Sequence, residues 1–393
     1  MENQRATFGS KLGVILVSVG SAVGLGNIWR FPYIAGEGGG GAFLIIYLLC
    51  LLIMGIPVLT AEFFVGKYTH LNAVGAYRKL APRTPWVAIG YNGVLAAFLI
   101  YGFYSVVAGW TLHYIWESAS GALAQFSTPA EYEAHFNAFV TNPWKPTIAT
   151  VGFMLITHAI IMLGVQKGIE RSSKLLMPLL FVILLVLCGR SISMEGGMEG
   201  LKFLFTPDFS KVTSQTFLNA VGQSFFSISA GLGCMIVYAS YFSDSTKIGS
   251  TAVSVALIDT LVAVLAAVMI FPAVFSVGIQ PTAGPSLVFI TLPNILNTLS
   301  FSWLWSTIFF LLLALAALTS TISIHEVVTA YVSEQWNVRR NRAAWLSTGA
   351  MLVLGIVCSL SFSVLSDWTI GGRSIFDFFD YLTANFMLPI GGI

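Results

Sequence analysis

The chain has 393 residues and a net charge of +2, and 56% of its residues are hydrophobic while only 9% are charged. Soluble domains carry about 25% charged residues, so this composition excludes a soluble globular protein. The small net charge and the scattered basic residues exclude a nucleic-acid-binding protein. With a mean hydropathy of +0.83, the chain is expected to lie in a lipid bilayer and to have no nucleic-acid partner.

Apolar segments long enough to cross a bilayer recur along the whole chain. A spanning helix needs about 20 mostly apolar residues, and ten segments meet this condition. The first is too long for a signal peptide and lacks a cleavage pattern. The tenth stops within an apolar run, so we expect C-terminal helices to be missing. The expected spans are residues 12–35, 41–67, 87–117, 147–166, 173–190, 214–241, 249–278, 301–335, 343–363 and 375–393.

Lys and Arg residues in the short loops indicate the orientation, because cytoplasmic loops are enriched in them. With a cytoplasmic N-terminus, thirteen of the nineteen basic residues fall inside and six outside. The loop 117–146, which contains Glu117, Glu131 and Glu133, then falls outside. We therefore expect a multi-pass protein of the cell (plasma) membrane with its N-terminus in the cytoplasm.

Two short runs of small residues interrupt apolar spans at corresponding places. The run 21–26 in the first span is echoed by 229–233 in the sixth, which crosses the membrane in the opposite direction. Paired glycine breaks in oppositely oriented helices indicate an inverted repeat with a site near the membrane midplane. We expect residues 1–190 to form the first five-helix repeat, 191–213 an extracellular connection and 214–393 the second repeat.

A broken helix in a membrane offers binding groups, because every backbone polar group in hydrocarbon needs a partner. Gly24 and Gly26, with Gly231 and Gly233, weaken helix continuity. The freed carbonyls suit Na⁺, and the freed amides suit a carboxylate. The alternative is that these small residues only let neighbouring helices approach closely. Two matched breaks, with Asn27 adjacent to the first, favour a binding site.

Ionisable residues inside spans are rare and usually functional. Asp259 lies in an apolar run with no Lys or Arg in its own helix, so its carboxylate needs a cation or a proton. Arg30 and Asp380 lie at similar depth on the outer side, and a pair between them would close the outer mouth. The alternative for these two residues is snorkelling to the membrane interface.

The run 20–32, Gly-Ser-Ala-Val-Gly-Leu-Gly-Asn-Ile-Trp-Arg-Phe-Pro, resembles the first helix of the neurotransmitter:sodium symporter family, and its bacterial amino-acid branch most closely. The resemblance covers essentially the whole chain. It implies an all-α, leucine-transporter-type inverted repeat of five plus five helices with helices 1 and 6 discontinuous, a fold that is itself the best-known example of this arrangement. The match continues at residues 39–43, 55–57, Glu62, 167–171, 222–227 and 319–320.

The resemblance also implies specific binding and gating residues. One sodium site would use Ala22, Asn27, Ser227 and Asp259, and a second would use Gly20, Val23, Ala316, Thr319 and Ser320. An amino-acid substrate would meet Ala22, Leu25, Gly26, Ile100, Tyr104, Phe226, Ser227, Ser229, Leu232, Ser320, Ser323 and Ile324. The outer gate would consist of Arg30, Gln223 and Asp380, and the inner gate of Arg5, Tyr241 and Glu334.

Two departures from the family pattern refine these expectations. The family usually has Asn where this chain has Asp259, and places chloride or a Glu nearby, where this chain has Ala263. Asp259 is therefore expected to supply the negative charge, so that chloride is not required. Leu232 replaces the Phe of some relatives and leaves room for a bulkier substrate. The spacing of Gly168 and Pro178 matches a helix end that unwinds in the family, although an ordinary proline kink explains it equally well.

The expected function is sodium-coupled import of a neutral, hydrophobic or aromatic amino acid by alternating access, with two sodium ions and no enzymatic activity. The alternatives are an inverted-repeat carrier for another small solute, a carrier coupled to protons, and a transport-inactive truncated form. An ion channel would need a continuous polar lining, and an intramembrane enzyme would need a catalytic set; the sequence shows neither. The sequence leaves the oligomeric state open.

Overall fold

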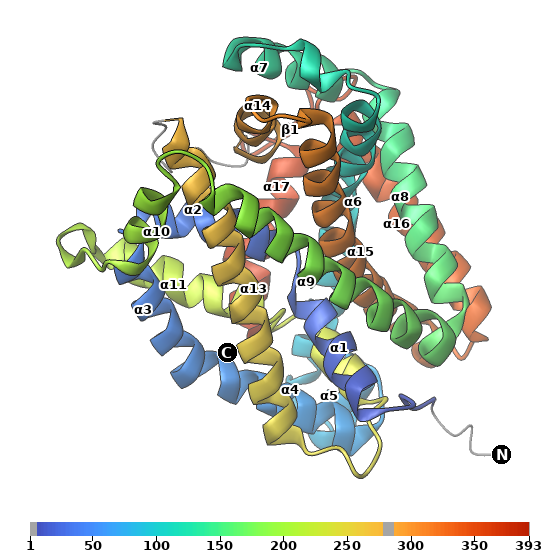
Figure 1. The fold of residues 1–393 in the computed structure, drawn as a ribbon. Coiled ribbons are helices and arrows are strands. Elements are labelled where there is room, and N and C mark those ends of the chain that lie inside the picture. The colour runs from blue at the N-terminus through green and yellow to red at the C-terminus, as the bar shows by residue number, and fades with distance from the viewer. Residues whose placement is uncertain (1–5, 278–286, 393) are drawn as a thin grey trace.

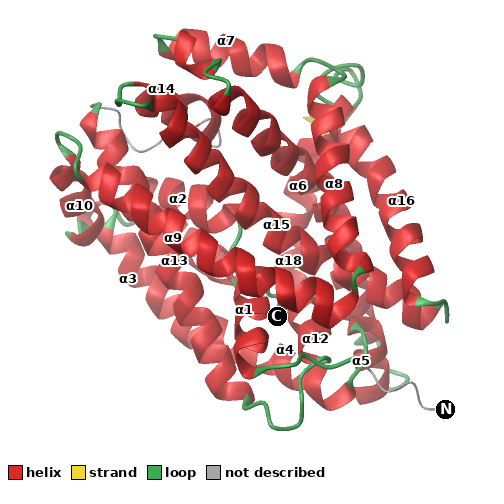
Figure 2. Cartoon of the chain, turned by 45° about the vertical axis from the view of Figure 1, so that its right-hand side comes forward, coloured by secondary structure: helices red, strands yellow, loops and turns green. Residues whose placement is uncertain are grey.

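The computed structural model describes residues 6–277 and 287–392, which are mainly helical. Figure 1 shows one helical bundle with α7 (Pro129–Val140) and α14 (Leu292–Asn297) at one end, and with α5 (Ala73–Leu80) and the N-terminus at the other. The view in Figure 2 shows the same separation. We call these two ends the α7 end and the N-terminal end.

Seven unbroken helices in the described part of the chain are long and apolar enough to cross a membrane. They lie at seven of the ten expected positions, and the ends of six of them are within four residues of those predicted. The fifth expected span, 173–190, begins eight residues earlier than predicted, at Val165. Their lengths, from 18 to 34 residues, are sufficient to cross the hydrocarbon core of a bilayer. The seven are Gly41–Thr69 (α3 Gly41–Cys50, η2 Leu51–Gly55, α4 Ile56–Thr69), α6 (Val87–Ala119), α8 (Lys145–Met162), Val165–Ile192 (η4 Val165–Glu170, α9 Arg171–Ile192), α13 (Ile248–Ser276), α15 (Ser302–Gln335) and α16 (Arg340–Leu360).

The first and sixth spans are discontinuous, which confirms the prediction from the glycine runs. The first consists of α1 (Lys11–Ala22), a short link, and η1 (Gly26–Arg30) continuing into α2 (Phe31–Glu37), with a bend of 57°. The sixth consists of α11 (Ser214–Ser227) and α12 (Cys234–Ala239).

The break in the sixth span has a conformational cause. Ser229, Gly231 and Gly233 have φ of 54°, 81° and 74°. Left-handed residues stop a right-handed helix, and glycine adopts this conformation without a Cβ clash. The two glycines that the sequence singled out, together with Ser229, therefore hold the link between α11 and α12 in a non-helical conformation.

The tenth expected span, residues 375–393, is helical from Ile375 to Gly392, but its middle is not α-helical. It runs through α17 (Ile375–Leu382), the π-helical turn η7 (Thr383–Met387) and α18 (Leu388–Gly392).

Several short elements in the loops were not predicted from the sequence. These are α5, α7, η3 (Leu123–Gln125), α10 (Gly197–Phe205), η5 (Phe209–Lys211), η6 (Leu287–Thr291), α14, and the hairpin β1 (Thr369–Ile370) and β2 (Arg373–Ser374).

Close helix packing holds the broken spans in the centre of the bundle. α1 packs against α9, α13 and α15, and α12 packs against α4 and α15. A Cβ atom at Gly66 of α4 would lie 2.1 Å from the carbonyl oxygen of Ile236 in α12, so only glycine allows this approach. Small residues at such crossings let membrane helices pack through their backbones. The continuous helices thus surround the two breaks.

Candidate functional site

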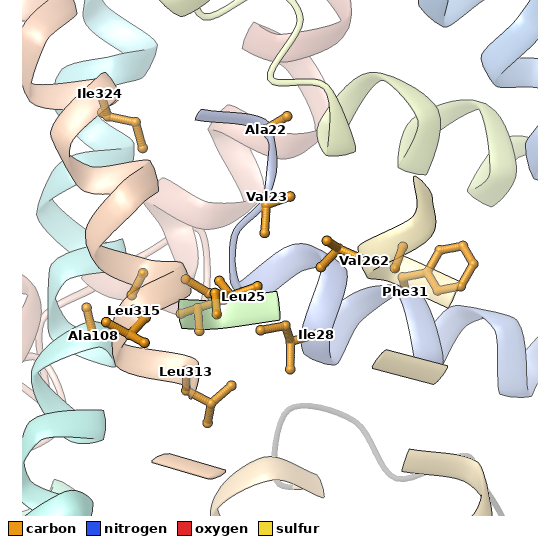
Figure 3. Packing of buried hydrophobic residues seen from close by; sticks show 14 of the residues in the cluster. Ala22, Val23, Leu25, Ile28, Phe31, Ala108, Val262, Leu313, Leu315 and Ile324 are labelled. Carbon is orange, nitrogen blue, oxygen red and sulfur yellow. The ribbon is translucent and has the colours of Figure 1, made fainter. Parts of the chain in front are cut away.

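The breaks in the first and sixth spans lie beside each other in the core. Figure 3 shows the non-helical link of the first span passing from Ala22 through Val23 to Leu25, with buried apolar side chains around it. The Ser229 hydroxyl, in the other break, donates a hydrogen bond to the Ser21 carbonyl at 2.9 Å. Both links expose backbone groups that a continuous helix would have paired. Ligand-binding groups therefore collect at the centre of the bundle.

The first group of polar side chains surrounds Asp259 of α13, which is completely buried. The Asn27 side-chain amide donates to the Asp259 carboxylate at 2.7 Å and to the Ser227 hydroxyl at 3.2 Å. The Ser227 hydroxyl in turn donates to the other Asp259 oxygen. Ala22 joins Asn27 in the lining of the adjacent cavity. The structure thus brings together all four residues expected at the first sodium site.

The electrostatics of this group favour a bound cation. In the described part of the chain, no Lys, Arg or His lies within ion-pair distance of Asp259. A buried carboxylate without a cationic partner is costly, because its desolvation is not compensated. Hydrogen bonds from Asn27 and Ser227 offset part of that cost. A small cation bound at this carboxylate would offset the rest.

The second group consists of neutral oxygen donors between α1 and α15. The Ser320 hydroxyl donates to the Val23 carbonyl at 3.0 Å, and the Thr319 hydroxyl donates to the Ala316 carbonyl at 3.0 Å and lies 3.4 Å from that of Val23. A Cβ atom at Gly20 would lie 3.4 Å from the Thr319 Cβ. All five residues expected at the second sodium site therefore lie together.

The chemistry of both groups suits a hard cation rather than a transition metal. Both groups offer carbonyl, hydroxyl or carboxylate oxygens, which hard cations prefer as ligands. Among the residues that the structure describes, no cluster of three or more His, Cys, Asp or Glu residues is arranged to hold a metal ion. The described residues therefore fit sodium in both places.

A small central cavity of about 40 Å³ lies between the two breaks. No charged side chain lines it among the described residues, and most of its walls are apolar or small. Tyr104 closes one side and accepts a hydrogen bond from the Leu25 amide at 3.0 Å. Nine residues expected to contact the substrate line this cavity: Ala22, Gly26, Ile100, Tyr104, Phe226, Ser229, Leu232, Ser320 and Ile324.

Three residues expected to contact the substrate do not line the central cavity. Leu25 lines a larger neighbouring cavity, Ser227 belongs to the Asp259 group, and the Ser323 hydroxyl donates to the Ser320 carbonyl at 2.7 Å. Ser21 and Gly24 also line the central cavity; both belong to the run that marked the first break, although neither was expected to contact the substrate. Sequence reasoning also missed Leu388 of α18, for which the sequence carries no signal.

Phe226 separates the central cavity from an outer cavity of about 510 Å³ toward the α7 end, whose lining includes Phe136 of α7. The Arg30 guanidinium lies 4.7 Å from the centre of the Phe226 ring and donates to the Gln223 side chain at 3.2 Å. Asp380 also lines the outer cavity. Arg30 and Asp380 are both described but do not form the expected ion pair, because the outer cavity is open between its walls.

The N-terminal end is closed by a chain of polar contacts. The Gly9 amide donates to the Glu170 carboxylate at 2.7 Å, and the Phe8 amide donates to the Tyr241 carbonyl at 2.9 Å. The Tyr241 hydroxyl donates to Glu326 at 2.6 Å, and Glu326 also forms an ion pair with Arg340 at 2.6 Å. The structure thus has an open outer cavity toward the α7 end and a network of polar contacts at the N-terminal end.

Tyr241 and Glu334, both expected at the inner gate, contact different residues. The Tyr241 hydroxyl donates a hydrogen bond to the Glu326 carboxylate. The Glu334 carboxylate instead accepts hydrogen bonds from the backbone and side-chain amides of Asn72, both at 2.8 Å. Arg5, the third expected member, lies outside the described residues. The pairing of Glu326 with Arg340 was missed, because the loop between α15 and α16 alone brings those two side chains together.

Comparison with known proteins identifies the family. A model described as the Sodium:neurotransmitter symporter family matches residues 5–138 and 134–392. The chain belongs to this symporter family. It is 41% identical to the uncharacterized sodium-dependent transporter YhdH of Bacillus subtilis, over 100% of this chain and 87% of that protein. It is 28% identical to the sodium-dependent serotonin transporter of Drosophila melanogaster, over 96% of this chain and 66% of that protein.

A solved relative supports the same assignment for this symporter. The crystal structure of MhsT in complex with L-phenylalanine matches with a TM-score of 0.90 and 45% sequence identity, and it covers 99% of this chain and 88% of MhsT. The leucine-transporter-type fold expected from the family resemblance is thereby confirmed. The chain is a sodium-dependent transporter of this family, and the bilayer is its environment.

Proposed function

We propose that this symporter uses the sodium gradient to import a neutral amino acid with a hydrophobic or aromatic side chain. The observation that carries the proposal is the juxtaposition of an uncharged, mostly apolar cavity with the buried Asp259 carboxylate. The phenylalanine complex of MhsT, which is 45% identical, supports the substrate class. The absence of charged side chains among the described cavity residues disfavours acidic and basic amino acids.

In this proposal, each of the two groups of polar side chains binds one sodium ion. The Asp259 group, with Ala22, would hold one sodium ion next to the amino acid, whose carboxylate completes the coordination. The neutral group around Thr319 and Ser320 would hold a second sodium ion between α1 and α15. When an ion binds there, both hydroxyls turn their lone pairs toward it and release the carbonyls that they now contact. The bound ion would thus link the first span to the continuous helix α15.

Asp259 also makes a chloride ion unnecessary in this proposal. A sodium ion and the positive end of a zwitterion bring positive charge into a buried region, and Asp259 supplies the compensating negative charge. Ala263, one turn later on α13, is apolar and fully buried. Amino-acid binding should therefore be equal in chloride and gluconate. Strict chloride dependence would contradict this assignment.

The difference between the open outer cavity at the α7 end and the polar contacts at the N-terminal end supports alternating access as the mechanism. The outer cavity leads to Phe226, which acts as the lid over the substrate, with Arg30, Gln223 and Asp380 as the outer gate. Closure would bring the Arg30 and Asp380 walls together. Opening at the N-terminal end then requires the contacts of Tyr241 and Glu326 to break, so that ions and amino acid leave on that side.

The remaining expectations belong to the same proposal. Residues 1–190 and 214–393 would form the two inverted repeats, joined by 191–213. The excess of Lys and Arg on the N-terminal side supports a cytoplasmic N-terminus in the plasma membrane. At the start of the fifth span, Gly168 lies in η4, and a Cβ atom there would lie 2.1 Å from the Ile160 carbonyl oxygen. This tight contact must loosen if the helix end is to unwind.

A binding screen of the purified protein tests the proposal. Each of the twenty amino acids competes with a labelled hydrophobic amino acid in a scintillation proximity assay, with either Na⁺ or K⁺ present. We expect saturable binding of hydrophobic or aromatic amino acids in Na⁺ only. Equal binding in K⁺, or binding that follows pH rather than Na⁺, would favour the proton-coupled alternative. Absence of binding by every amino acid would refute the substrate class.

A further inference from the structure

One wall of the central cavity comes from an element that the family resemblance did not implicate. Leu388, the first residue of α18, lines the cavity and is 5% exposed. The other large aliphatic side chains of the lining are Ile100 of α6, Leu232 of the break in the sixth span, and Ile324 of α15. Leu388 is thus the contribution of α18 to the apolar wall of the cavity.

The backbone around Leu388 is fixed by direct contact with the break in the sixth span. A Cβ atom at Gly231 would lie 2.7 Å from the Leu388 carbonyl oxygen, and one at Gly391 would lie 2.5 Å from the Gly231 carbonyl oxygen. Gly231 has a φ of 81°, and its amide donates to the Glu62 carboxylate at 2.8 Å. No side chain fits between the two backbones, so the break and α18 hold each other in place.

A second contact anchors the same turn from α6. The Asn92 side chain donates a hydrogen bond to the Met387 carbonyl at 2.8 Å. This carbonyl ends the π-helical turn Thr383–Met387, and such turns often mark functional positions in helices. Asn92 lies eight residues before Ile100 on α6, so one helix carries both an anchor of α18 and a wall of the cavity. Leu388 is thus held from two sides.

We propose that Leu388 forms the end wall of the substrate side-chain pocket and sets the size of the amino acid that the symporter accepts. The inference rests on the proposed function, because it assumes that the central cavity holds an amino acid. The cavity is small, so the volume of one wall residue strongly changes the space available. Differences of one methylene in an apolar pocket change discrimination by about 10- to 200-fold.

Substitutions that change only the volume at this position test the proposal. Leucine, phenylalanine and tryptophan compete with a labelled amino acid at saturating Na⁺, on the wild type, Leu388→Ala and Leu388→Phe. Leu388→Ala should improve tryptophan affinity relative to leucine by about tenfold or more. Leu388→Phe should reduce the relative affinity for both aromatic amino acids by a similar factor. The proposal is overturned if both variants keep the wild-type ratios within about twofold.

Ile390→Ala is the matched control, because Ile390 lies on the same helix but is 59% exposed and outside the cavity lining. Its affinity ratios should equal those of the wild type; an equal shift in this control would overturn the proposal. If Leu388→Ala does not fold, Leu388→Val, which removes one methylene, carries the same comparison. Sodium-dependent binding by the wild type with unchanged ratios in the variants overturns this inference alone. Absence of amino-acid binding by the wild type overturns the proposed function.

Discussion

Replacing Asp259 with Asn removes one charge from the centre of the molecule while keeping its shape. The Asn oxygen can still accept the hydrogen bond that the Asn27 amide now donates at 2.7 Å. Asp259 is fully buried and has no cationic side chain at ion-pair distance within the described residues. The substitution therefore separates the role of the carboxylate charge from its role in packing.

The expected loss of sodium affinity follows from electrostatics. Two unit charges about 4 Å apart attract by about 4 kcal/mol at an effective dielectric constant of about 20. Since each 1.4 kcal/mol is tenfold in affinity, sodium binding should weaken on the order of 100-fold even if other groups compensate for a third of the attraction. At a sodium concentration 100 times the wild-type Kd, the stabilisation by sodium should fall from about 2.7 to about 0.4 kcal/mol.

Thermal unfolding in Na⁺ and in K⁺ measures the stabilisation by sodium and the stability without sodium. The wild type should be stabilised by Na⁺, and Asp259→Asn should lose most of this shift. Without sodium the variant should be more stable than the wild type, because no uncompensated charge remains buried. Its amino-acid binding should also become dependent on chloride. Asp367→Asn, on the exposed surface, is the matched control. An unchanged sodium affinity in Asp259→Asn, without chloride dependence, would refute the reasoning.

Three further substitutions test other parts of the account. Thr319→Val should raise the sodium concentration for half-maximal binding and reduce the cooperativity of its titration; an unchanged titration would exclude Thr319 as a ligand. Gly26→Ala should weaken amino-acid binding, because the added Cβ would lie 2.4 Å from the Phe226 ring and such overpacking costs about 1–3 kcal/mol. Gly222→Ala is the control and should leave binding unchanged, because a Cβ atom there meets no atom within 4 Å. Pro178→Ala should slow uptake in vesicles by delaying sodium release; wild-type turnover would contradict a role in unwinding.

The sequence was sufficient to predict the spans and both broken helices, because their signals are local. About 20 apolar residues indicate a span, and the paired glycine runs marked the breaks that the structure shows at residues 23–25 and 228–233. The capping residues Thr128 and Glu131 at the start of α7 are also local. A capping box of this kind marks a helix start, so the sequence carried a signal for this loop helix that was missed.

The parts that could not be predicted depend on the register between distant helices. Leu388 lines the central cavity and directly follows a π-helical turn, which shifts the helical register relative to the α-helical period read from the sequence. Glu326 and Glu334 lie eight residues apart on α15, and the sequence does not indicate which of them contacts Tyr241. Periodicity identifies the buried face of a helix, but the partner of each side chain depends on the three-dimensional packing.

Uptake by the purified protein in proteoliposomes tests the central claim most directly. Labelled phenylalanine or leucine is supplied outside, with either an inward sodium gradient, equal sodium on both sides, or an inward proton gradient without sodium. The account predicts transient accumulation above the external concentration only with the sodium gradient, and loss of that accumulation when an ionophore dissipates it. Accumulation driven by protons alone, or uptake that never exceeds equilibrium under the sodium gradient, would contradict it.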